Sequence, residues 1–219
     1  MTTLKEIKLH CPVCTRDFTD QAVLSTNSFG GKRTDFHERA AGKQPLPYYV
    51  HTCPRCGYSG GEHGFSDDVE VASSVAEHIQ YELMPRVEQE MPLSGSEKYE
   101  MASKVASWRG ADSREVADLL LRAAWCCVDE GDIEAERYFR RRAALAFADA
   151  LAEYDVVAKD ERAVLTYLVG ELWRRVGDMG RSHEWFGKVA GEIMDPVAGK
   201  WIIDATRRQD SAHPREWFG

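Results

Sequence analysis

The residues best suited to chemistry in this sequence are four cysteines arranged as two Cys-x-x-Cys pairs. The pairs are Cys11-Pro-Val-Cys14 and Cys53-Pro-Arg-Cys56, and proline follows the first cysteine in both. Zinc prefers four tetrahedral ligands, and each such turn supplies two thiolates from one tight loop. We therefore predict one site for structural zinc formed by all four sulfurs. A single iron ion is the alternative occupant of the same ligand set.

The residues around the two pairs refine this prediction. Gly57 follows the second pair, where the backbone must bend sharply and bring N–H groups toward sulfur. Thr15 stands at the equivalent position after the first pair. His10 and His51 precede the pairs and could act as alternative ligands or as groups around the site. Four thiolates leave no open coordination position, so the predicted site is structural rather than catalytic.

The segment between the pairs carries two other candidate sites. Asp35 and His37 are close enough in sequence for acid–base work, although no nucleophile accompanies them. Basic residues interleaved with aromatic ones can bind single-stranded nucleic acid by electrostatics and stacking. The same aromatic residues could instead form the small core of a zinc ribbon. The basic candidates are Lys32, Arg33, Arg39 and Lys43, with Phe36, Tyr48 and Tyr49 nearby.

The chain changes character near residue 66. Residues 1–66 are rich in Gly, Pro and Cys, with short β-branched and aromatic stretches, whereas long amphipathic segments follow. We predict a mainly α protein with a β-rich, zinc-ribbon-like module at 1–66 and an all-helical, repeat-like module at 67–219. The two modules are expected to pack against each other.

Helix boundaries in the second half follow from local signals. The first predicted helix has an apolar stripe from Val71 to Leu83 and should end near Pro85. Ser94-Gly-Ser-Glu97 has the spacing of a capping box and predicts a second start. Asp112 predicts a third start, and Asp195-Pro196 predicts a last helix with proline in its first turn.

Two Gly-Asp turns suggest repeated helical hairpins. Gly131-Asp132 and Gly177-Asp178 stand 46 positions apart, and each lies between a helix bearing Trp and one bearing an aromatic pair. The pattern is typical of tetratricopeptide-like hairpins, but the spacing exceeds that family's repeat of about 34 residues. An irregular helical bundle would use the same helices.

Composition favours an ordinary globular protein, with 43% hydrophobic and 29% charged residues among 219. Residues 1–66 hold 8 Lys and Arg against 6 Asp and Glu, and the rest hold 20 against 30. The excess of negative charge after residue 66 disfavours the electrostatic attraction to phosphates that dominates nucleic-acid binding. No apolar run predicts a secretory signal or a membrane span, so we expect a cytoplasmic protein. In a reducing compartment, paired cysteines indicate metal rather than disulfides.

Several stretches together resemble a bacterial family catalogued as domain of unknown function 2225. The similar stretches are Cys11-Pro-Val-Cys14, Thr34-Asp35-Phe36, Pro45-Leu-Pro-Tyr-Tyr49, Cys53-Pro-Arg-Cys56-Gly57-Tyr58, Gly95-Ser-Glu-Lys-Tyr-Glu100 and Ala123-Ala-Trp125. The resemblance implies N-terminal Cys-x-x-Cys pairs with all four cysteines as ligands, followed by repeat-like helices. Thr15 and Ser59-Gly-Gly61 depart from the family's knuckles without affecting the ligands. The family brings no established activity.

Our leading hypothesis is a non-enzymatic zinc-binding adaptor whose paired helices hold a protein or peptide partner. A homodimer could cover the ends of so short a repeat array. The alternatives are a nucleic-acid-associated regulatory protein using residues 28–49, an enzyme with a site near Asp35 and His37, and a redox sensor that releases zinc on oxidation.

Three further features have structural interpretations. Cys126 and Cys127 are neighbours on one helix and are expected to be buried packing residues. The arginines at 137, 140, 141 and 142 are expected to form a solvated helix face with local ion pairs. Trp217 and Phe218 should dock on this chain or on a partner.

Overall fold

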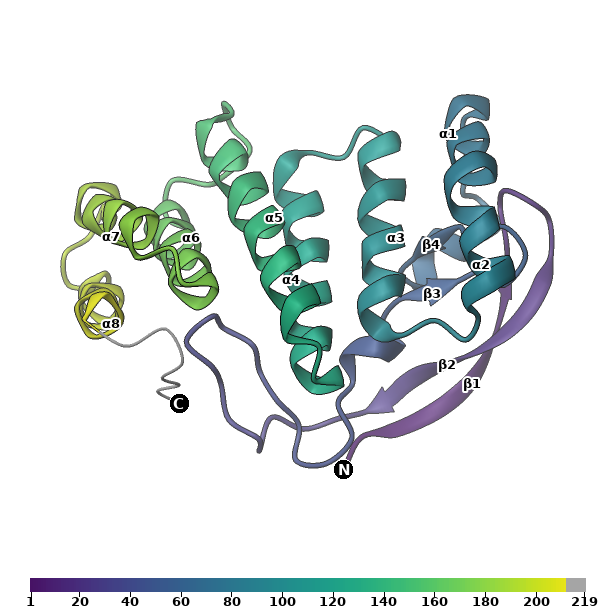
Figure 1. Cartoon of the computed structure of the whole chain (residues 1–219), viewed down its shortest axis with the longest axis horizontal. Helices are drawn as coiled ribbons and strands as arrows, with labels where there is room; N and C mark the ends of the chain where they lie inside the picture. Colours follow the sequence, from purple (N-terminus) through teal and green to yellow (C-terminus); the bar gives the residue numbers. More distant parts are fainter. Residues whose placement is uncertain (212–219) are drawn as a thin grey trace.

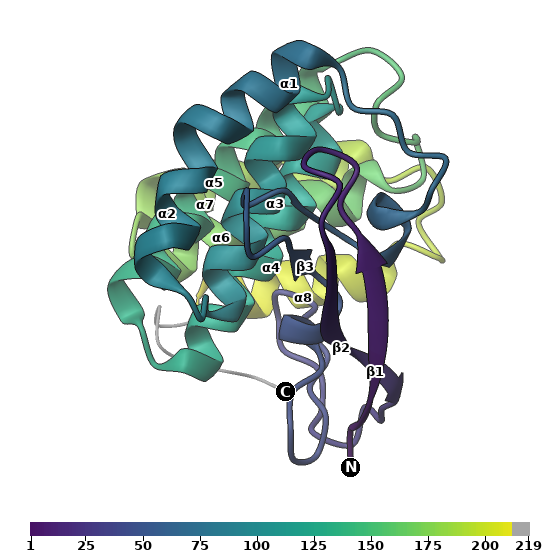
Figure 2. The same cartoon turned by 90° about the vertical axis from the view of Figure 1, so that its right-hand side faces the viewer.

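The N-terminal part of the chain is built from two short antiparallel hairpins. In the computed structural model, which describes residues 1–211, β1 (Thr3–His10) pairs with β2 (Asp17–Ser25). Strand β3 (His51–Thr52) pairs with β4 (Ser59–Gly60). The first hairpin lies at the α1–α2 end of the molecule (Figures 1 and 2). The predictions for Trp217 and Phe218 fall outside the described residues.

The remainder is helical, which confirms the mainly α fold. The helices are α1 (Ser73–His78), α2 (Met84–Glu90), α3 (Gly95–Trp108), α4 (Ser113–Glu130), α5 (Ile133–Ala152), α6 (Arg162–Val176), α7 (Met179–Lys188) and α8 (Lys200–Asp210). From α3 to α7 each helix packs on the next along the chain, as Figure 1 shows. Among residues 1–211, no helix combines the length and apolar character needed to cross a membrane.

Side-chain caps fix the helix starts that the sequence predicts. Ser94 and Glu97 form a reciprocal capping box at α3, which confirms that prediction. Asp112, Asp132 and Asp178 each accept a hydrogen bond from the backbone three residues later, at the starts of α4, α5 and α7. The Gly-Asp turns work because each glycine adopts the left-handed conformation that ends the preceding helix, with φ of 77° and 88°.

Two helix boundaries differ from the prediction. The first helix does not end near Pro85, because a π-helical turn at Ile79–Leu83 joins α1 directly to α2, which runs on to Glu90. Pro85 lies in the first turn of α2, where a missing N–H donor is tolerated. The last helix begins at Lys200 rather than after Pro196, since the Asp195 carboxylate accepts backbone bonds from Val197 and Ala198 in a separate turn.

Two large apolar clusters organise the molecule. One lies between α4, α5 and α6 and includes the buried Cys126 and Cys127, as expected. The other surrounds the paired cysteines and combines side chains of β1 with side chains of α1, α2 and α3. Residues before and after position 66 therefore share one core, and the proposed division into two modules stays a prediction.

Candidate metal centre

The four cysteines of the two pairs converge on one point. All four sulfurs lie within 4.8 Å of one another, and the closest cross-pairs, Cys11–Cys56 and Cys14–Cys53, are 3.6 and 3.5 Å apart. A tetrahedron of zinc–sulfur bonds of about 2.3 Å places its sulfurs about 3.8 Å apart. Three of the cysteines are buried and Cys14 is half-buried. The cluster is compatible with a metal ion such as zinc.

The electrostatics of the cluster also favour a cation. Without a cation, neighbouring sulfurs must share protons: the bond with Cys53 raises the pKa of Cys11 to about 12, and the bond with Cys11 raises that of Cys56. The same sharing lowers the pKa of Cys53 to about 2. Four neighbouring thiolates would repel one another. A bound divalent cation offsets this repulsion by neutralising part of their negative charge.

The two knuckles use the same backbone turn. In each, the residue after the second cysteine has positive φ and donates its N–H to the carbonyl of the first cysteine, at 2.9 Å for both Thr15 and Gly57. Gly57 has φ of 82° and Thr15 has φ of 56°. Thr15 therefore adopts, with strain, the conformation that glycine adopts freely at the second knuckle.

This difference gives opposite expectations for two substitutions. Thr15→Gly should raise the free energy of unfolding by about 0.5–1 kcal/mol, because it removes left-handed strain. Gly57→Ala should lower the free energy of unfolding by more than about 2 kcal/mol. The new Cβ would lie 2.7 Å from Leu83 Cβ, and alanine would be strained at this positive φ. Denaturant unfolding of the metal-loaded proteins measures both. Equal effects of the two substitutions would contradict the shared-turn description.

The two histidines near the pairs contact aspartates of β2. His10 Nδ1 lies 2.7 Å from Asp17, and His51 Nδ1 lies 2.9 Å from Asp20. The buried His51 ring packs against Phe65. The ring of Tyr58 also packs against Phe65. Within residues 1–211, the cluster with metal-ligand geometry contains only the four cysteines. The histidines therefore support the fold of the hairpins around the site.

The segment between the pairs runs against helices α4, α5 and α6 (Figure 1). The side chain of Asp35 is fully buried and accepts hydrogen bonds from Arg140 at 2.7 Å and from Trp125 Nε1 at 3.0 Å. Burial alone would raise the pKa of Asp35, but the charge of Arg140 holds this pKa below its usual value. Arg140 also bonds Glu136 at 2.7 Å. The expectation of a solvated arginine face is therefore wrong at Arg140, whose side chain is buried with two carboxylates.

A second ionic network holds the neighbouring residue Thr34. Its hydroxyl donates to Glu171 at 2.6 Å and accepts from Arg175 at 2.8 Å, and its carbonyl accepts from the Tyr167 hydroxyl. Glu171 also binds Arg174 at 2.7 Å. Sequence reasoning missed this network because α6 was interpreted only through its apolar stripe. The available signal was a Glu with arginines three and four positions later.

His37 belongs to the same buried region. Its ring stacks on Trp125 at 4.8 Å between centroids and 6° between planes, and its side chain is 1% exposed. Burial lowers the pKa of His37 to about 4, although the negative charge of Asp35 raises this pKa in part. Asp35 and His37 thus lie together as predicted, but both are enclosed by protein and the carboxylate is committed to Arg140. In this conformation no substrate reaches the pair.

The buried imidazole predicts a specific pH dependence of stability. Its pKa is about 4 when folded and 6.5 when free, so the unfolded chain binds the extra proton between these values. Stability conferred by neutral His37 is complete above pH 6.5 and falls by about 3 kcal/mol as pH drops to 4. His37→Phe keeps the stack without titrating. As the pH falls from 6.5 to 4, the wild type should therefore lose more unfolding free energy than His37→Phe does. A difference between the two proteins that stays constant over this range would contradict the assignment.

The four basic residues proposed for nucleic acid have protein contacts. Lys32 lies 3.5 Å from Glu38, and Arg39 lies 2.5 Å from Asp129 on α4. Lys43 sits over the ring of Tyr48 at 4.6 Å. Arg33 is half-buried, and burial lowers its pKa despite the nearby Asp35. Nucleic-acid contact by these residues stays a prediction.

Comparison with known proteins places nearly all of the described chain in one family. The family model whose description is "Uncharacterized protein conserved in bacteria (DUF2225)" matches residues 4–212. The searches of curated proteins and of solved structures returned no match. The match includes both cysteine pairs, the buried segment between them and the helices through α8. The chain belongs to the bacterial family DUF2225.

Proposed function

We propose that this protein is a non-enzymatic adaptor, stabilised by one structural zinc ion, that binds a protein or peptide partner through its helices. The observation that carries the proposal is an exposed apolar face on α5. Tyr138 and Leu145 are 50% and 53% exposed and stand seven positions apart, so they lie on one side of α5, opposite the side that it buries in the core. We call Tyr138 and Leu145 the α5 face.

The ligand chemistry supports zinc as the resident metal. Cys11, Cys14, Cys53 and Cys56 would complete a closed tetrahedron, leaving no position for a substrate or a reactive water. Soft thiolates also suit an iron centre, which remains the alternative occupant. In either case, the ion would hold the two hairpins together and support the core that they share with α1, α2 and α3.

The surroundings of the α5 face fit a partner that carries an anchoring side chain. Arg142 lies 5.4 Å from the Tyr138 ring, and tyrosine and arginine are enriched at protein interfaces. A cavity of about 680 Å³ opens beside Tyr138, between α5 and the start of α3. Its walls include Glu97 and Glu130. These carboxylates would favour a basic anchor on the partner.

Two other surfaces are less suited to a partner. Residues 33–37 of this chain already cover the side of α4 and α6 around Trp125 and Glu171. The basic residues 32, 33, 39 and 43 have acidic or aromatic neighbours of their own. The helical body is acidic, which opposes nucleic-acid binding. The α5 face remains exposed, and the partner proposed for it is a protein or peptide rather than a nucleic acid.

The test is affinity capture of the tagged protein from its own host, with and without nuclease. We expect one stoichiometric protein to persist after nuclease and to be lost from a Tyr138→Ala/Leu145→Ser variant. Tyr81→Ala is the matched control, because Tyr81 is also highly exposed but lies in the π-helical turn at the other end. Capture that survives the double substitution, depends on nucleic acid or fails altogether would contradict the proposal.

A further inference from the structure

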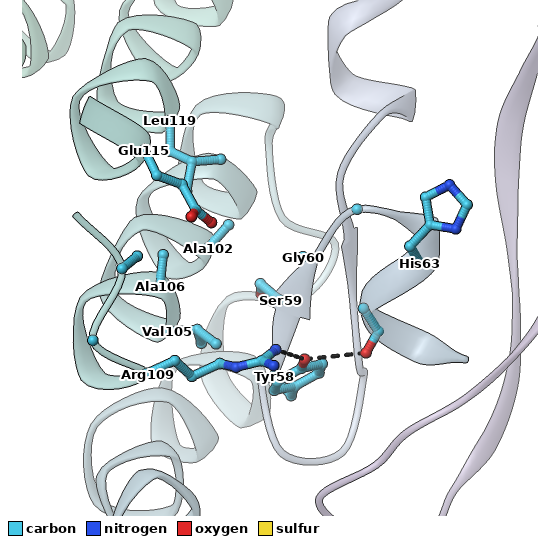
Figure 3. A pocket seen from close by; sticks show the side chains of 14 residues that line it. Tyr58, Ser59, Gly60, His63, Ala102, Val105, Ala106, Arg109, Glu115 and Leu119 are labelled. Atoms are coloured by element: carbon cyan, nitrogen blue, oxygen red, sulfur yellow. Dashed lines mark hydrogen bonds between the residues drawn. The ribbon is translucent and has the colours of Figure 1, made fainter. Parts of the chain in front are cut away.

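A second cavity lies between the β3–β4 hairpin and the turn from α3 to α4. It has a volume of about 470 Å³, within the range of small-molecule sites. Figure 3 shows it between Ser59 and Gly60 on one side and the two helices on the other. The metal centre and the α5 face contribute none of its lining.

Small side chains create this space. Ala102 and Ala106 on α3 form one wall, and the backbone of Gly60 and Gly61 forms another. A Cβ added at Gly60 would meet no heavy atom within 4 Å. Leu119 contributes an apolar surface from α4. The middle of the cavity is therefore suited to a compact apolar group.

Opposite charges flank this apolar middle. Arg109 and Glu115 lie on opposite sides of Ala102 and Ala106 in Figure 3, while the ring of His63 points away. The Arg109 guanidinium donates to the Tyr58 hydroxyl at 3.0 Å. Across the part of the chain that the structure describes, neither Arg109 nor Glu115 forms an ion pair.

One hydrogen bond anchors the exposed arginine to a buried side chain. Tyr58, which accepts from Arg109, donates its own hydroxyl proton to the Gly64 carbonyl at 3.1 Å. The Tyr58 ring is buried beside the metal cluster. A guanidinium fixed at one nitrogen keeps its other N–H groups available for a carboxylate, which it binds with good geometry.

We propose that this cavity binds a short peptide with free amino and carboxyl ends. The peptide's carboxylate pairs with Arg109, its ammonium group pairs with Glu115, and its side chain packs on Ala102 and Ala106. This inference goes beyond the proposed adaptor function. It involves a different surface and requires no protein partner.

Calorimetric titration of the metal-loaded full chain with L-alanyl-L-leucine tests the proposal. The free dipeptide should bind, and blocking either end as the N-acetyl or C-amide derivative should weaken binding about tenfold or more, because each removes one charge-assisted interaction. Absence of dipeptide binding up to millimolar concentration, or equal affinity for all three compounds, would overturn the proposal.

Two variants link each end of the peptide to its residue. In Arg109→Gln, the free dipeptide and its C-amide should bind equally, while acetylation should still weaken binding. In Glu115→Gln, acetylation should lose its effect while amidation keeps it. Arg207→Gln, at an exposed arginine on α8, should bind like wild type. Melting curves check that the variants are folded. Dipeptide binding that neither pocket variant alters would reject these roles.

Discussion

Cys53→Ser should release the metal and lower the free energy of unfolding by about 5 kcal/mol or more. Binding of a structural metal contributes directly to folding, and in small zinc modules it decides whether they fold. The loss should extend beyond residues 1–66, because Cys53 and Cys56 share their core with Ile79, Leu83 and Met101. Metal analysis and hydrogen exchange should show metal loss with faster exchange in the hairpins and in α1–α3, and retained protection in α6.

Cys127→Ala is the matched control for this substitution. Cys127 is also a buried free cysteine, but it lies in the α4–α6 cluster. Its replacement should leave the metal in place and cost about 1–2 kcal/mol through the small cavity that it creates. A Cys53→Ser protein that keeps its metal and the wild-type melting curve would disprove the shared site.

Asp35→Ala should lower the free energy of unfolding by about 3–5 kcal/mol. The substitution removes one of the two carboxylates that lie 2.7 Å from the buried guanidinium of Arg140, and it removes the acceptor of Trp125 Nε1. Removing one carboxylate is costly because the buried Arg140 charge then depends on Glu136, which lies 2.7 Å away. Denaturant unfolding measures the loss. The metal content should stay at the wild-type level, since Asp35 is no part of the cysteine cluster.

A double substitution separates the charge effect from simple loss of contacts. Asp35→Leu with Arg140→Met should recover part of the stability, because apolar pairs often replace buried ion pairs without loss and Glu136, which loses its partner, is 18% exposed. Asp129→Asn is a comparison for a pair nearer to solvent, since Arg39 and Asp129 are 33% and 17% exposed. It should cost no more than about 1 kcal/mol. Additive losses at Asp35 and Arg140 would contradict the explanation that the Asp35 variant is destabilised by the remaining arginine charge.

Local signals in the sequence predicted the parts of the structure that depend on few residues. The Cys-x-x-Cys spacing is sufficient to identify a candidate metal cluster, although it does not identify the metal. The capping box at Ser94 and the left-handed glycines at 131 and 177 depend on adjacent backbone atoms. These features could therefore be predicted before the tertiary structure was known.

The features that were missed depend on long-range packing. Pro85 usually marks a helix end, but a π-helical turn allows the helix to continue where Leu83 packs against Gly57. Arg140 is part of a run of arginines, and its partner Asp35 comes from 105 positions away. Its burial could have been expected, because Arg140 stands three, four and seven positions before the buried Ala143, Ala144 and Phe147. The identity of its distant partner could not. The pairing of Thr34 with Glu171 spans 137 positions.

The most direct test of the central claim is X-ray absorption spectroscopy at the metal edge, combined with metal quantification on the purified full chain. We expect one zinc ion per chain with four sulfur ligands at about 2.3 Å. One iron ion with four sulfurs would keep the site but reject its assignment to zinc. Nitrogen or oxygen ligands in place of any sulfur, or a chain that folds without metal, would contradict the proposed tetrathiolate centre formed by Cys11, Cys14, Cys53 and Cys56.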